Sequence, residues 1–214
     1  MKIVTAKKGG KNRVELIFDD GQIVSLAYEI FLKNNLKVSQ EISDEFLADL
    51  LKADKLYRLK HFALNYISRR AHSKSELKTK LRQKKFEDDL INLTLDELEK
   101  NKFIDDTTFA QLFTEEKIKS KRWGKNKIKS ELIKRGVDSK IISDVMDEKF
   151  SGESEIEKGL ELAERKFKQL LKRNLEHKKV QLGIYSFLIS RGYDYDSCKQ
   201  IVGKLFKETE LTDL

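Results

Sequence analysis

The fold is decided by residues 125–146, which read KNKIKSELIKRGVDSKIISDVM. Their large apolar residues are Ile128, Leu132, Val137, Ile142 and Met146, spaced as on the buried faces of two short helices. The same pattern occurs 51 residues earlier, at Leu77, Leu81, Phe86, Ile91 and Leu95. A looser copy follows 56 residues later, at Ile184, Leu188, Tyr193, Cys198 and Val202. The chain is therefore predicted to contain three copies of one helical unit.

Turn and capping residues set the expected boundaries of these helices. Ser73-Lys74-Ser75-Glu76 is a capping-box pattern, and Asp106 and Asp138 precede helical runs as candidate N-caps. Gly136 and Gly192 supply a positive-φ stop after the second helix of their units. The predicted three-helix units span residues 55–104, 105–150 and 153–208, and short links between them favour an elongated stack with shared interfaces.

The N-terminal segment, residues 1–54, has a different pattern. β-rich runs at Ile3–Thr5, Arg13–Phe18 and Gln22–Leu26 are separated by glycine-containing turns. A sheet this small needs a packing partner, which we expect to be the helices that follow. The predicted fold is thus mostly α, an elongated array of tandem three-helix repeats behind a small β-hairpin or three-stranded sheet.

Composition supports a helical, cation-rich protein. The 214 residues include no proline, and 37% are charged, with a net charge of +8. Residues 55–135 carry 22 basic and 12 acidic side chains, whereas each flank has a net charge of −1. One cysteine excludes an intrachain disulfide framework. With no visible signal peptide or membrane-spanning stretch, we expect a cytoplasmic protein without membrane contact.

The basic surplus gathers in two neighbouring repeats and points to a polyanionic partner. Lys74, Lys78 and Arg82 recur at helical spacing, opposite Leu77 and Leu81. The full set of candidate binding residues is Arg69, Arg70, Lys74, Lys78, Arg82, Lys85, Lys121, Arg122, Lys125, Lys127 and Lys129. The alternative is that a lysine-rich face only solvates the helices.

The sequence does not indicate catalysis. His61, His72 and His177 are scattered, the paired aspartates fall in turns or at helix starts, and no glycine has a phosphate-loop context. We expect no catalytic residue, metal or cofactor, and we interpret Cys198 as a small buried hydrophobe. Trp123 fits a packing anchor or a base-stacking platform, and Phe103, Phe109 and Phe113 fit core packing.

Three blocks of the chain resemble the signatures of the RecX family of bacterial recombination regulators, in the family's order. They are ALNYISRRAHSKSELKTKL at 63–81, LEKNKFIDDTTFA at 98–110 and KRWGKNKIKSELIKRGV at 121–137. Two residues depart from the family pattern: Ala71 stands where proline is common, and Lys85 where glycine is usual. The motif positions that carry the resemblance structurally are Leu77, Leu81, Asp105, Asp106, Phe109, Ala110, Gly124, Leu132 and Gly136.

This resemblance implies a non-catalytic regulator of recombination, DNA repair and the SOS response. Such a protein binds the filament of the RecA recombinase on single- or double-stranded DNA and reduces ATP hydrolysis and strand exchange by capping the filament or occupying its groove. Two other functions fit the residues alone: a general nucleic-acid-binding helical module, or a structural adaptor with an incidental charge surplus. A repeat stack needs no symmetric partner, so we expect a monomer, although an exposed strand edge near residues 2–26 could recruit a second copy.

Overall fold

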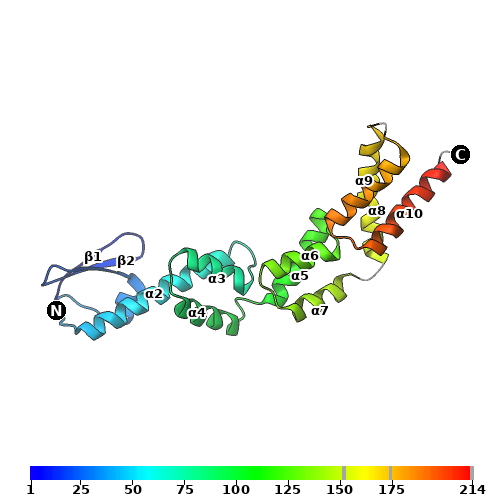
Figure 1. Cartoon of the computed structure of the whole chain (residues 1–214). Helices are drawn as coiled ribbons and strands as arrows, with labels where there is room; N and C mark the ends of the chain where they lie inside the picture. The colour runs from blue at the N-terminus through cyan, green and yellow to red at the C-terminus, as the bar shows by residue number, and fades with distance from the viewer. Residues whose placement is uncertain (151–152, 174, 213–214) are drawn as a thin grey trace. The chain divides into compact units, whose positions relative to one another are not determined.

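The computed structural model describes residues 1–150, 153–173 and 175–212 (Figure 1). Three strands at the N-terminus are followed by helices to the end of the described chain, which confirms the predicted fold class. The chain forms two compact units. One contains Met1–Arg70 with Leu77–Phe103, and the other contains Ala71–Glu76 with Ile104–Leu214.

The N-terminal strands form an antiparallel sheet in the order β1-β2-β3. The strands are β1 (Ile3–Lys8), β2 (Arg13–Phe18) and β3 (Ile23–Ala27), at the positions that the sequence predicts. Alternate residues of β2 are buried, and a bulge at Val4 shifts the β1 register. One face of the sheet packs with residues of α1 (Tyr28–Lys33) and α2 (Asp44–Ile67) in a common core.

A buried ion pair joins the sheet to α2. Asp54 lies among the buried residues of α2 and is 4% exposed. Its carboxylate accepts the Ala27 N–H at 2.6 Å and pairs with the Arg13 guanidinium at 3.1 Å. Hydrogen-bonding and charge pairing together allow a carboxylate to be buried in an otherwise apolar helix face.

The remaining helices follow in groups of three along the chain. After α2 come α3 (Lys74–Gln83) and α4 (Asp88–Lys100), and then α5 (Asp106–Lys121), α6 (Lys125–Lys134) and α7 (Ser139–Lys149). The last group is α8 (Glu153–Leu171), α9 (His177–Arg191) and α10 (Tyr195–Thr212). Of the fifteen apolar positions that define the sequence repeat, only Phe86 is not buried, being half-buried against Phe62.

The helix ends confirm most of the predicted caps. The Ser73 hydroxyl accepts the Glu76 N–H, and Asp138 accepts the Lys140 N–H. Gly136 and Gly192 have φ of +68° and +92°. The prediction that Asp106 caps α5 is wrong: Asp105 accepts the Thr107 N–H there, whereas Asp106 accepts the Lys74 N–H at the start of α3.

Two expectations about packing have different outcomes. Cys198 is fully buried, as predicted, and burial raises the pKa of its thiol to about 11. Phe109 is buried and Phe113 packs against it, but the prediction that Phe103 is a core residue is wrong. Phe103 follows the end of α4 in a turn, and its side chain is 54% exposed.

Candidate anion-binding surfaces on α3 and α6

Helix α3 carries the first group of predicted cations. Lys74, Lys78 and Arg82 are spaced at four residues along the helix, and Leu77 and Leu81 are buried. The Arg82 Nε donates to Asp88 Oδ1 at 2.7 Å. This hydrogen bond raises the pKa of Arg82 and lowers the pKa of Asp88. Arg82 is therefore already neutralised locally, while Lys78 has no ion-pair partner within the described ranges.

The other predicted cations of this region flank α3. Arg69 and Arg70 are exposed just after the end of α2, and Lys85 is exposed after α3. Lys85 has a φ of +61°, so it holds the left-handed position that Gly136 holds 51 residues later. Its side chain is free to extend into solvent because the helix has ended before it.

Helix α6 and the turn before it carry the second group. Arg122 pairs with Glu161 at 2.9 Å, and Lys125 pairs with Asp147 at 3.2 Å. The Lys127 ammonium donates to the Ser190 carbonyl at 3.0 Å. Lys121 and Lys129 are exposed and have no ion pair with any residue that the structure describes. The structure thus gives three of these five cations an internal partner and leaves two to solvent.

The two helices match each other position by position. Both contain ten residues and begin with a lysine, at Lys74 and Lys125. The repeat spacing of 51 pairs three basic residues of each copy: Arg70 with Lys121, Lys74 with Lys125, and Lys78 with Lys129. We call these six residues the repeated basic triple. In the third copy the equivalent positions are His177, Gln181 and Tyr185, so this basic triple is confined to the first two repeats.

Helix stability does not explain the lysines in the first turn of α6. Its first turn has no acidic residue, and positive charges at a helix N-terminus oppose the helix dipole. Three backbone donors there are already used: the Gly124 N–H donates to Arg191 O at 2.9 Å, the Lys125 N–H to the Glu155 carboxylate at 3.4 Å and the Asn126 N–H to Gly192 O at 3.0 Å. An anion at this helix start would therefore be bound mainly by the lysine side chains.

The glycines and small residues of the motif blocks form the contacts between repeats. The Ser73 hydroxyl donates to the carbonyl of Arg135 at 2.6 Å, and Gly124, 51 residues after Ser73, donates to the carbonyl of Arg191. A Cβ at Gly136 would collide with Ser75, and one at Gly124 would lie 2.6 Å from the Gly192 carbonyl carbon. The same joint is thus built twice, and it fixes where each basic helix begins.

Trp123 packs at the edge of the second repeat. It is half-buried against the core of α5, α6 and α7, which contains Phe109, Leu132 and Val145. The ammonium groups of Lys127 and Lys117 lie 5.0 and 5.8 Å from its ring centroid. The structure confirms the packing role, and the cation contacts orient Lys127 along the ring.

Two further findings bear on the kinds of site present. In the described part of the chain, no three His, Cys, Asp or Glu side chains are grouped to hold a metal ion. None of the described helices is both long and apolar enough to cross a membrane.

Comparisons with known proteins agree with the repeat. Residues 60–98 match the family model "RecX, first three-helix domain", and residues 105–146 match "RecX, second three-helix domain". A "Regulatory protein RecX" of Clostridium acetobutylicum is 30% identical over 207 residues, which cover 96% of this chain and 95% of the relative.

Two solved structures are also similar. A crystal structure of regulatory protein RecX covers 94% of this chain and 98% of its own, with a TM-score of 0.72 and 21% identity. A crystal structure of RecX from Lactobacillus salivarius covers 72% of this chain and 97% of its own, with a TM-score of 0.64 and 26% identity. Sequence similarity over nearly the whole chain and the shared fold therefore place this chain in the RecX family of regulatory proteins.

Proposed function

We propose that this protein regulates homologous recombination by binding the RecA–DNA filament and inhibiting its ATP hydrolysis and strand exchange. The observation that carries the proposal is the repeated basic triple, present in the two repeats that match the family models and absent from the third. Placing the same cations at the same helix positions twice suits a partner that presents anionic groups at regular intervals. A nucleoprotein filament is such a partner.

The inhibition is proposed to be steric and electrostatic. Lysine and arginine side chains at these positions contact phosphate or acidic protein surface, and such contacts position a protein without reading the base sequence. The helical repeats themselves then occupy the filament groove or cap its end. No chemical step on the nucleotide is assigned to this chain.

The first test is DNA-dependent ATP hydrolysis by the host RecA on single-stranded DNA, titrated with this protein after filaments have formed. We expect progressive loss of hydrolysis at substoichiometric ratios, because one bound molecule blocks growth for many RecA subunits. Loss only at amounts that saturate the strand would indicate competition for DNA, and no loss would contradict the proposal.

A charge-reversal variant tests the repeated basic triple directly. Lys78→Glu with Lys129→Glu changes two matched lysines that hold no ion pair in the described chain. Lys100→Glu with Lys140→Glu is the matched control, since both lysines are exposed on other helices. We expect the first variant to inhibit at least tenfold more weakly than the unchanged chain, and the control to inhibit as strongly as the unchanged chain. Both variants should have equal helicity by circular dichroism. Equal inhibition by both variants would remove the triple from the mechanism.

Binding to naked DNA separates the regulator from a general nucleic-acid-binding module. A module that acts without RecA would bind single-stranded DNA with a log–log salt slope of about −0.7 per phosphate contacted. It would also lose that binding in the Lys78→Glu, Lys129→Glu variant. Strong inhibition of RecA together with weak binding to naked DNA at moderate salt would favour the filament-specific function.

A further inference from the structure

The N-terminal sheet has a partly open edge next to an apolar pocket, far in sequence from the basic helices. β1 is an edge strand, and only its beginning is covered. The Ile3 N–H donates to Gln40 O at 3.0 Å, and the Ile3 carbonyl accepts the Ser39 N–H at 2.8 Å. The loop before α2 therefore protects the edge at Ile3 but not along the rest of β1.

The ladder shows which backbone groups remain open. Lys7 is opposite Glu15, and the Gly9 N–H donates to Arg13 O, so these residues of β1 and its turn face β2. In an antiparallel ladder the residues between them direct N–H and C=O away from the partner strand. Those residues are Ala6 and Lys8, and neither has a backbone partner on the open side among the described residues.

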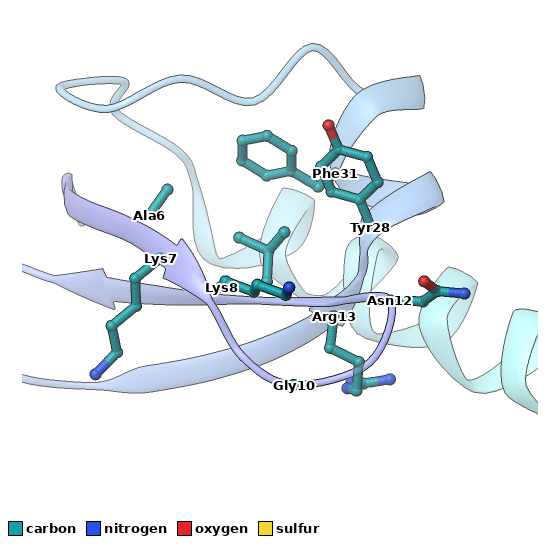
Figure 2. Close-up of a pocket in the computed structure, with 9 residues that line it drawn as sticks. Ala6, Lys7, Lys8, Gly10, Asn12, Arg13, Tyr28 and Phe31 are labelled. Carbon is teal, nitrogen blue, oxygen red and sulfur yellow. The ribbon is translucent and has the colours of Figure 1, made fainter.

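The pocket lies on the same side of the sheet as these two side chains. Ala6 and Lys8 are opposite Leu16 and Val14, which are buried in the core face. The pocket has a volume of about 390 Å³, with Ala6, Val14, Tyr28 and Phe31 among its walls. Figure 2 shows Tyr28 and Phe31 across the pocket from the strand that carries Ala6 and Lys8, while Lys7 points away from them. Tyr28 is 51% exposed, so its ring is accessible.

Basic side chains outnumber acidic ones around this edge. Residues 1–14 include five basic side chains and no acidic one. Lys7 pairs with Glu15 at 3.4 Å and Arg13 with Asp54 at 3.1 Å, but Lys8 and Lys11 have no ion pair within the described part of the chain. Lysines on an open edge disfavour pairing with another copy of the same edge, because like charges would be brought together. They favour an anionic partner instead.

We propose that β1 binds an extended acidic peptide of a partner protein, which adds to the sheet as a fourth strand. Its backbone would pair with the open N–H and C=O groups of Ala6 and Lys8. A residue opposite Ala6 lies on the pocket side of the sheet, so an apolar side chain there enters the pocket beside Tyr28 and Phe31. The residue two places along lies opposite Lys8, where a carboxylate is complementary.

A labelled probe peptide tests this with the full chain, by fluorescence anisotropy. The probe is Asp-Asp-Val-Phe-Val-Asp-Asp, which places its phenylalanine and two aspartates on one face. The controls replace the phenylalanine by alanine, or all four aspartates by lysine. We expect the probe to bind at least tenfold more tightly than either control. Equal binding of all three, or no binding at millimolar concentration, would overturn the proposal.

Variants separate strand addition from simple charge attraction. Ala6→Pro removes an N–H that points away from β2, so the existing ladder is kept while the open edge is blocked. We expect at least tenfold weaker binding for Ala6→Pro, for Lys8→Glu and for Tyr28→Ser, the last two keeping the test decisive if the proline variant fails to fold. Lys52→Glu, exposed on α2, is the charge control and should bind within twofold of the unchanged chain.

Amide exchange followed by NMR gives a residue-specific readout. Before binding, the amides of Ala6 and Lys8 should exchange quickly and that of Lys7 slowly; with peptide bound, all three should be slow. Binding without protection at Ala6 and Lys8 would contradict strand addition. A competition experiment tests for nucleic acid at the same site. If oligo-dT displaces the probe from the unchanged chain and from Ala6→Pro, but not from Lys8→Glu, the site would instead be assigned to nucleic acid. None of these measurements involves RecA, so they stand or fail independently of the proposed regulation.

Discussion

At the scale of single residues, Lys85 holds a position that suits glycine. Gly136 and Gly192 occupy the equivalent sites in the next two repeats, and all three residues have positive φ. The left-handed conformation costs a non-glycine residue about 1–2 kcal/mol, partly offset because glycine loses more entropy on folding. Lys85 therefore carries a backbone cost that a glycine at this position would avoid.

Replacing Lys85 should therefore stabilise the protein. We expect Lys85→Gly to raise the free energy of unfolding by about 1 kcal/mol, measured in urea, because the backbone strain is removed. Lys85→Ala is the matched control, since it removes the same charge but keeps a Cβ, and it should give no such gain. A gain of equal size in both variants would show that charge and not φ is responsible.

Glu155 is a second residue whose environment has a measurable consequence. Its carboxylate accepts the Lys125 N–H at 3.4 Å, and burial raises its pKa. An acid with a raised pKa in the folded state favours the protonated form, so its contribution to stability is present below the ordinary glutamate pKa and lost as pH rises through the folded value.

The expected result is a pH-dependent gain from Glu155→Gln. Glutamine keeps the acceptor oxygen but carries no charge to be buried, so the variant should gain stability relative to the unchanged chain at pH 7 and lose that advantage near pH 4. Urea unfolding at both pH values measures this difference, with Glu157→Gln, at an exposed position of the same helix, as the control. A difference that does not vary with pH would contradict the role of burial.

At the scale of elements, the hydrogen-bonded joint that connects one repeat to the next occurs twice along the chain. Ser73 and Gly124 both donate to the last carbonyls of a helix in the following repeat, and both lie one residue before a basic helix. Position 136 requires glycine for two reasons. The φ there is +68°, and a Cβ would collide with Ser75.

Substituting Gly136 should be correspondingly costly. We expect Gly136→Ala to lower the free energy of unfolding by about 2–4 kcal/mol, the sum of backbone strain and overpacking. Gly203→Ala is the control within the same compact unit, because a Cβ there meets open space and alanine favours a helix. Calorimetry of both variants measures the change. If Gly136→Ala lowers the free energy of unfolding by less than about 1 kcal/mol, the backbone around Ser75 must shift to accommodate the Cβ, and the prediction is wrong.

The elements themselves could largely be predicted from the sequence, and the errors have physical causes. Strand alternation, apolar helical spacing and glycine stops are local signals, so β2, the helix ends at Gly136 and Gly192, and the Ser73 and Asp138 caps were all predictable. Asp106 caps α3, which begins 32 residues earlier, instead of its own helix. The buried Asp54 forms an ion pair with Arg13 of β2. Such partners lie far away in sequence, and no local pattern identifies them.

At the scale of the whole molecule, the hydrophobic residues form separate cores. One lies between the sheet, α1 and α2, another among α5, α6 and α7, and another among α8, α9 and α10. We propose that the predicted segments 1–54, 55–104, 105–150 and 153–208 open as local units, although the first two share the continuous helix α2 and belong to one compact unit. Repeat proteins behave in this way because each repeat contacts only its neighbours.

Mutations in distant cores should then act locally. Leu16 in the sheet core and Ile184 in the last core are both fully buried, so each alanine substitution should cost about 2–5 kcal/mol. We expect Leu16→Ala to speed amide exchange in residues 1–54 and Ile184→Ala in residues 153–173 and 175–208, by hydrogen-exchange mass spectrometry. Equal acceleration along the whole chain in both variants would indicate a single cooperative unit.

The sequence by itself determined the repeated helical unit, the small sheet, the concentration of cations in two repeats and the resemblance to RecX. Apolar spacing, glycine placement and charge counts are properties of neighbouring residues, so they can be read without coordinates. The tertiary structure decided which cations are already paired, as with Arg82 and Asp88 or Lys125 and Asp147. It also decided that β1 has open groups beside a pocket, since pairing and burial depend on residues brought together only by folding.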